Sequence, residues 1–139
     1  MIFKTQVEER SLKVLDNFNL DLFKKLNPWW NLMEIIRFDG VRKDAITELK
    51  VGPFKQIFST RIAMIGLNRF TDVGVKLPFP FTYWQHNHII VPNIHGGTNI
   101  IDDIEYECFF LLTPFVHIYL TMMFKYRQKI YKKIFRRSV

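Results

Sequence analysis

Two strand-like runs that meet at Gly96-Gly97, residues 82–91 and 98–109, constrain the fold more than any other part of the chain. Side chains two apart on a strand point to the same face, so the two runs can share one face of a hairpin. That face would carry aromatic, aliphatic and polar side chains together: Trp84, His86, His88, Ile90, Thr98, Ile100, Asp102, Ile104 and Tyr106. Polar groups that converge among aromatic walls are more typical of a ligand pocket than of a plain core. We therefore expect a pocket in a curved sheet.

A long amphipathic helix is predicted after the hairpin, over residues 114–136. Pro114 suits the first turn of a helix, and Thr113 is the expected N-cap. Apolar residues recur every three or four positions and are expected to face the sheet: Phe115, Tyr119, Met122, Tyr126, Ile130 and Ile134. An antiparallel sheet needs its apolar face covered, and this helix is the natural cover.

The rest of the chain predicts further strands and two short helices. Residues 2–8 alternate as a strand, and residues 11–26 have a helical spacing that Asn17 or Asn19 breaks into two short helices. Turn and alternation signals predict four more strands, at residues 32–38, 45–51, 56–65 and 68–75. The predicted class is α+β, with about seven antiparallel strands curved around a long C-terminal helix and two short helices after the first strand. At 139 residues the chain is expected to be a single domain, residues 1–139.

The positive charge is concentrated at the C-terminal end. The net charge is +7, and residues 125–137 hold seven Lys and Arg side chains without a carboxylate, so the first 124 residues are neutral. A neutral body excludes a broad nucleic-acid-binding surface, and no nucleic acid is expected as a partner. The basic segment Lys125–Arg137 is interpreted as a solvated helix face. The alternative is an interaction module that docks weakly through this segment on a membrane surface or a partner protein.

The cysteine usage and the N-terminus predict the compartment. The single cysteine, Cys108, excludes an internal disulfide and is expected to be a small buried hydrophobe rather than a nucleophile. The N-terminal residues are charged from Lys4 onward and lack the apolar core of a signal peptide. We therefore expect a cytoplasmic location.

Three sequence segments resemble helix-grip proteins of the START/Bet v 1-like superfamily, also called SRPBCC or polyketide cyclase/dehydrase-like: WQHNH, GGTNIIDDIEY and FKYRQKIYKKIF. The resemblance covers nearly the whole chain and points to an unassigned bacterial branch. It is sharpest in the spacing of Trp84, His86, His88, Thr98, Asp102, Tyr106, Tyr126 and Arg127. It implies a seven-stranded antiparallel sheet that grips a C-terminal helix, with a hydrophobic small molecule or lipid between them. It does not imply one reaction, because members include carriers, cyclases, hydrolases and regulators.

The partner that this resemblance implies is a small hydrophobic or amphipathic ligand, lipid-like or polyketide-like, and no cofactor is assigned. Apolar walls are expected from Phe79, Phe81, Trp84, Tyr106, Phe115, Tyr119 and Met122. Four polar side chains are expected to orient one end of the ligand or to fix the architecture: His86, His88, Asp102 and Arg127. In the architectural role, a buried Asp102 would pair with Arg127 and hold the helix to the sheet, because a half-paired buried charge is costly.

The two histidines leave more than one chemical interpretation open. Two imidazoles and Asp102 can hold a metal, but a histidine pair hydrogen-bonded to Asp102, Thr98 or backbone is preferred, and no metal is assigned. His86 or His88 beside Asp102 can instead shuttle protons near neutral pH. These three side chains are therefore the candidate catalytic residues of an alternative cyclase- or dehydratase-type enzyme. Asp72 is expected to be a solvated strand residue.

Overall fold

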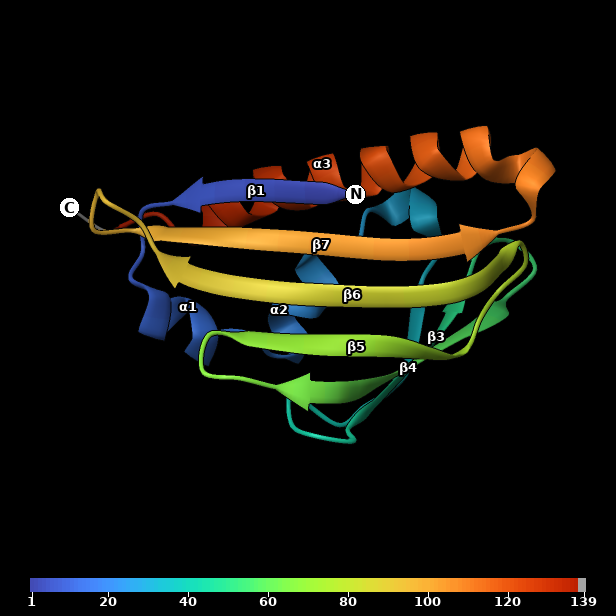
Figure 1. Cartoon of the computed structure of the whole chain (residues 1–139), viewed down its shortest axis with the longest axis horizontal. Helices are drawn as coiled ribbons and strands as arrows, with labels where there is room; N and C mark the ends of the chain where they lie inside the picture. The colour runs from blue at the N-terminus through green and yellow to red at the C-terminus, as the bar shows by residue number, and fades with distance from the viewer. Residues whose placement is uncertain (138–139) are drawn as a thin grey trace.

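Seven antiparallel strands form one sheet, in the order β1-β7-β6-β5-β4-β3-β2 (Figure 1). The computed structural model describes residues 1–137. The strands are β1 (Ile2–Val7), β2 (Glu34–Phe38), β3 (Ile46–Val51), β4 (Gln56–Ile65), β5 (Arg69–Lys76), β6 (Phe81–Pro92) and β7 (Thr98–Cys108). Register shifts in the β2–β3 and β4–β5 pairs bend the sheet. The seven predicted strands are confirmed, with bounds that differ by no more than two residues.

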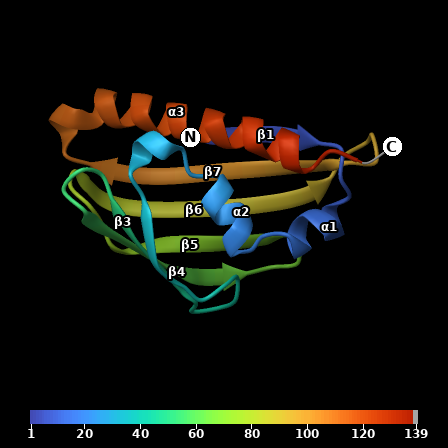
Figure 2. The ribbon, with the colours of Figure 1, turned by 180° about the vertical axis from the view of Figure 1, so that it is seen from behind.

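Three helices cover one face of this sheet (Figure 2). They are α1 (Ser11–Asp16), α2 (Leu20–Lys25) and α3 (Thr113–Ile134), with short 3-10 turns at η1 (Trp29–Asn31) and η2 (Phe110–Leu112). The Asn19 side chain accepts a hydrogen bond from the Leu22 amide at 3.0 Å and caps α2, which confirms the predicted break between two short helices. The predicted N-cap of α3 is wrong. Leu112, the last residue of η2, holds the cap position without a side-chain bond, and Thr113 is already helical.

The β6–β7 hairpin is closed by a loop that Asn93 organises. Its side-chain oxygen accepts hydrogen bonds from the His95 amide at 2.9 Å and from the Gly97 amide at 3.0 Å. Gly96 has a φ of 80°, a backbone conformation that favours glycine. Gly97 packs so closely on β1 that a Cβ there would collide with the Val7 carbonyl oxygen. The Gly-Gly pair is therefore a turn device that also lets β1 approach β7.

The face that α3 turns to the sheet overlaps only in part with the predicted one: Tyr119, Ile130 and Ile134 pack against the core as half-buried side chains. Its buried residues are Val116, Leu120, Phe124 and Tyr131. Phe115 and Met122, which were expected to face the sheet, are 69% and 54% exposed. Apolar residues stand on every side of the first half of α3, so their spacing does not select one face. The fit against the sheet selects it, with Phe124 stacked on Phe3 of β1 at a ring-centroid distance of 5.2 Å.

Two clusters of buried apolar side chains form the core. The first lies under α1, α2 and the end of α3, and contains Val7, Val14, Leu22, Leu26, Ala45, Ile62, Phe70, Ile90, Ile100, Tyr131 and Phe135. The second joins the middle of α3 to β6 and β7, and contains Trp84, Ile104, Val116, Leu120 and Phe124. The second cluster fills the centre of the space between α3 and the sheet. Among the described residues, no helix is both long and apolar enough to span a bilayer.

Candidate functional site

Two histidines lie side by side on β6, on the face that the helices cover. His86 is 3% exposed, and its ring centroid is 3.6 Å from that of His88. Phe70 of β5 stacks on the other side of the His88 ring at 4.2 Å, and Phe124 of α3 meets the His86 ring edge-on at 5.3 Å. Both rings therefore point into the interior, which confirms that the two residues share one face of the strand.

Two carboxylates on the neighbouring strands bind these rings in a crossed pattern. In the strand register, Asp72 of β5 lies opposite His86, and Asp102 of β7 lies opposite His88. The hydrogen bonds run to the diagonal partner instead. Asp102 Oδ1 is 2.8 Å from His86 Nε2, and Asp72 Oδ2 is 2.7 Å from His88 Nε2. Diagonal neighbours on a sheet face lie within reach of long side chains, so each carboxylate ties two strands together.

The expectation that Asp72 is a solvated strand residue is wrong. Its side chain is 13% exposed, and besides His88 it accepts a hydrogen bond from the Trp84 indole nitrogen at 3.2 Å. The sequence contains one signal of this position. Phe70, two residues earlier on β5, is buried, and residues two apart on a strand share a face. Only the pairing of β5 with β6 brings this carboxylate to the histidines.

The electrostatics of the quartet Asp72, His86, His88 and Asp102 favour ionised carboxylates. Burial by itself raises the pKa of Asp72, but the His88 hydrogen bond and the two imidazole charges together outweigh it, and the pKa falls below its ordinary value. The pKa of Asp102 is lowered in the same way: burial opposes the shift, and His86, His88 and the Arg127 charge outweigh burial. Burial and the proximity of His86 lower the pKa of His88. Both causes disfavour the charged form of the His88 ring.

Arg127 does not make the ion pair with Asp102 that the sequence suggested. Within residues 1–137 it has no carboxylate oxygen within 4.0 Å, and its guanidinium carbon lies 4.9 Å from the centre of the Phe124 ring. Asp102 is paired with His86 instead, because the neighbouring strand supplies a nearer partner than the helix does. Arg127 acts on Asp102 at longer range, through its charge.

A small cavity of about 100 Å³ adjoins the histidine rings. α2, β2 to β6 and α3 all contribute to its wall, and the polar side chains among its lining are Asn19, Thr47, Thr60, Asp72, His86, His88, Arg127 and Tyr131. Four buried polar atoms of this region have no hydrogen-bond partner within the described chain: His88 Nδ1, Asp102 Oδ2, Arg127 Nε and the Tyr131 hydroxyl. Because nearly all buried polar atoms in proteins are paired, these four atoms call for partners such as water or another polar group in the cavity.

A second hollow, of about 400 Å³, opens at the other end of α3. Four of the predicted apolar residues line it: Phe79, Phe81, Phe115 and Tyr119. Burial raises the pKa of Tyr119 to about 12, and its hydroxyl donates a hydrogen bond to Asn31. The structure places three other predicted wall residues elsewhere. Trp84 is buried in the core, Tyr106 packs against that cluster, and Met122 is exposed.

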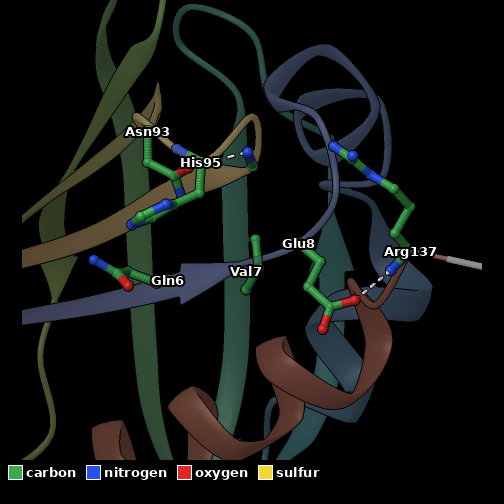
Figure 3. A pocket seen from close by; sticks show the side chains of 7 residues that line it. Gln6, Val7, Glu8, Asn93, His95 and Arg137 are labelled. Atoms are coloured by element: carbon green, nitrogen blue, oxygen red, sulfur yellow. Dashed lines mark hydrogen bonds between the residues drawn. The ribbon is translucent and has the colours of Figure 1, made fainter.

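A third hollow, of about 620 Å³, lies at the end of β1 and has a polar lining (Figure 3). Asn93 and His95 of the hairpin loop meet Gln6 and Glu8 there, and the Arg137 amide donates a hydrogen bond to Glu8 Oε2 at 3.0 Å. It shares no lining residue with the histidine cavity. No sequence pattern indicates this hollow, because it arises where three separate segments meet.

The architecture defines the class: an α+β helix-grip protein, in which a curved antiparallel sheet holds a long C-terminal helix. The sequence matches no protein-family model and no curated protein. Solved structures share the fold. A nucleoside-diphosphate sugar epimerase from Corynebacterium glutamicum has a TM-score of 0.75 at 24% sequence identity, and the match covers 93% of this chain and 27% of that chain.

Two further structures match over nearly their full length. A START-superfamily protein from Mycobacterium smegmatis has a TM-score of 0.62 at 16% identity, covering 96% of this chain and 97% of that one. Ara h 8.0201, a Bet v 1-like protein, has a TM-score of 0.61 at 12% identity, covering 94% and 95%. The chain spans about a quarter of the epimerase, of which the match covers 27%. The chain therefore has the helix-grip fold of the START/Bet v 1-like (SRPBCC) superfamily, as the resemblance predicted.

Proposed function

We propose that residues 1–139 act as one domain that binds a small hydrophobic or amphipathic molecule. The observation that carries this proposal is the 400 Å³ hollow at the start of α3, whose lining includes aromatic side chains from three parts of the chain. Phe79 comes from the β5–β6 connection, Phe81 from the start of β6, Phe115 and Tyr119 from α3, and Trp30 from η1. Its volume falls in the range of about 300–1,000 Å³ that small-molecule sites occupy. The fold supports the proposal, since proteins that share it typically bind hydrophobic ligands.

The volumes of the two hollows indicate which part of a ligand each could hold. The histidine cavity, at about 100 Å³, takes only a small polar group or a few water molecules. The apolar part of a ligand therefore belongs in the aromatic hollow. Val116, Leu120 and Phe124 separate the two spaces, so one long ligand would reach both only if these side chains moved. We propose that His86, His88, Asp102 and Arg127 meet a polar end in that case and stabilise the interior otherwise.

An amphipathic dye tests the aromatic hollow. 1-Anilinonaphthalene-8-sulfonate carries an apolar ring system and one anionic group, and its fluorescence rises when it enters an apolar site. Phe115→Glu places a charge on the wall of the hollow and is expected to weaken binding about tenfold, or about 1.4 kcal/mol. Ile118→Glu is the matched control, because Ile118 is 58% exposed on the same helix and does not line the hollow. Equal affinity of both variants, or no dye binding by the unmodified chain, would count against the proposal.

A second proposal concerns the basic end of the chain, where six of the seven cations are exposed: Lys125, Lys129, Lys132, Lys133, Arg136 and Arg137. Anionic headgroups attract each such cation by about 1 kcal/mol near a membrane surface. We propose a weak contact between this segment and an anionic membrane at the cytoplasmic side. The single exception, Arg127, lines the histidine cavity.

Vesicle sedimentation tests this contact. The unmodified chain should sediment with phosphatidylserine-containing vesicles and not with pure phosphatidylcholine vesicles. A triple charge reversal on α3 should abolish sedimentation: Lys125→Glu, Lys129→Glu and Lys132→Glu. A triple reversal of exposed lysines elsewhere is the control for net charge: Lys24→Glu, Lys25→Glu and Lys43→Glu. Equal losses in the two triple variants would show that only total charge matters.

A further inference from the structure

Three side chains of the histidine cavity present ligand atoms to one point. Asp72, His86 and His88 each offer one ligand atom, and these three atoms lie within 4.8 Å of one another. The Asp72 oxygen is 2.7 Å from His88 Nε2 and 3.9 Å from His86 Nδ1. Ligand atoms about 2.0–2.2 Å from a Zn²⁺ ion stand roughly 3.0–3.5 Å apart, so the two distances bracket the separation that a metal needs. The rings are tilted by 31° and would turn slightly to direct both nitrogen lone pairs at the ion.

The fourth member of the quartet lies where a supporting carboxylate belongs. Asp102 Oδ1 is 2.8 Å from His86 Nε2, the nitrogen on the far side of the ring from Asp72. It is also 3.8 Å from His88 Nδ1, which has no other partner. Histidines that bind a metal almost always donate their second ring N–H to a carboxylate, a carbonyl or water, which fixes the tautomer and the ring orientation. Asp102 supports His86 in this way, and a small movement would bring His88 Nδ1, now 3.8 Å away, within hydrogen-bond distance.

Charge and space favour a cation at the same point. Asp72 and Asp102 are two buried carboxylates, and Arg127, whose charge acts on Asp102, makes no ion pair with either. Buried charges need compensation, and a divalent ion supplies it. The adjoining cavity of about 100 Å³ leaves room for water at the remaining coordination positions. Phe23 of α2 and Gly40 and Val41 of the β2–β3 connection also line this cavity.

From this geometry we propose that Asp72, His86 and His88 bind one divalent transition-metal ion, and that Asp102 orients the two imidazoles from the opposite side. Three protein ligands with open positions toward a cavity are the arrangement of catalytic rather than structural metal sites. The site is independent of the aromatic hollow and of the ligand proposed for it. It differs from the arrangement considered from the sequence, in which Asp102 was the third ligand.

Zinc uptake by the untagged chain tests the site. The purified protein is incubated with Zn²⁺, passed through a desalting column and analysed for protein-bound zinc by mass spectrometry of the element. The unmodified chain should retain about one zinc per chain, as a three-ligand site predicts. Asp72→Asn and His88→Gln should each lower zinc affinity by tenfold or more, and Asp102→Asn should lower it by about 10–100-fold, the usual effect of losing a supporting carboxylate. Each variant is checked for folding by circular dichroism.

Three controls cover the other zinc-binding side chains. His95→Gln and His117→Gln remove the two remaining histidines, both exposed, and Cys108→Ser removes the single thiol. These variants should keep the wild-type stoichiometry. Zn²⁺ should also raise the thermal midpoint of the unmodified chain, because a ligand that binds only the folded state stabilises it. No retained zinc and no thermal shift in the unmodified chain would overturn the proposal, and so would loss of zinc in a control variant but not in His88→Gln.

Discussion

His86 Nε2 lies 2.8 Å from Asp102 Oδ1 across the β6–β7 pair, and both side chains are almost completely buried. The carboxylate stands opposite His88 in the register, so this contact is a diagonal one that couples two steps of the hairpin. A second diagonal hydrogen bond, between Asp72 of β5 and His88 of β6, couples these two strands in the same way. The three central strands are thus joined by buried polar bonds as well as by their backbones.

Removal of Asp102 from the His86–Asp102 pair should lower the stability of the fold. Asp102→Ala leaves His86 without its partner in the interior, and we expect the free energy of unfolding to fall by about 3–5 kcal/mol. Asp103→Ala is the control, because the neighbouring residue points to the opposite face of β7 and should change stability by less than about 0.5 kcal/mol. Urea denaturation at neutral pH measures both. Similar losses in the two variants would show that the His86–Asp102 pair does not stabilise the fold.

Acid should destabilise the protein in two stages. The pKa of His88 is lowered in the folded state, mainly by burial, so below about pH 6.5 the unfolded chain binds this proton more readily and stability falls toward the lowered pKa. The pKa values of Asp72 and Asp102 are also lowered, so their contribution is complete above about pH 4 and is lost as the pH falls through their folded-state values. Unfolding free energies measured across this range should show both stages.

The variant His88→Gln separates the loss of stability near neutral pH from the loss at lower pH. His88→Gln should lose the pH dependence between about pH 7 and about pH 5 and keep the fall at lower pH. His95→Gln, which changes an exposed histidine of the hairpin loop, should retain both stages. A wild-type free energy of unfolding that rises as the pH is lowered from 7 to about 5 would contradict the assignment to His88.

Truncations on opposite faces of α3 test which face packs on the sheet. Phe124 is 1% exposed and stacks on Phe3, so Phe124→Ala should lower the free energy of unfolding by about 3–5 kcal/mol. Phe115 is 69% exposed, and Phe115→Ala should cost less than about 0.5 kcal/mol. Chemical denaturation decides between this arrangement and the face that the apolar spacing predicted. A larger loss from Phe115→Ala would restore the sequence-based prediction.

A single methyl group should disturb the junction of β1 with the hairpin loop. Gly97→Ala would press a Cβ against the Val7 carbonyl oxygen, a backbone atom that cannot swing aside, and we expect a loss of about 1–3 kcal/mol. Gly66→Ala is the control, because its Cβ would meet the flexible Arg69 side chain at 2.9 Å. Thermal unfolding of the two variants gives the comparison. Equal midpoints would mean that β1 can shift to accommodate the methyl group.

Much of the fold could be predicted because its signals are local. Strand alternation, the break between the two short helices and the glycine turn at residues 96–97 each act within a few residues, and the structure bears them out. The candidate site was predicted only in part. His86, His88 and Asp102 share one hairpin, so their meeting followed from spacing. Asp72 joins them through a separate strand, and no local pattern predicts which carboxylate reaches a given histidine.

The sequence by itself determined the order of the strands and main helices, their approximate extent and the shared face of the two histidines, since these depend on the fixed periods of helix and strand. Tertiary structure decided which face of α3 packs on the sheet, which partner Asp102 takes and where the hollows remain. Those outcomes depend on the competition between side chains for the same interior space. Asp102 bonds to His86 rather than to Arg127 because the pairing of β6 with β7 brings His86 and Asp102, 16 residues apart in the sequence, to within 2.8 Å.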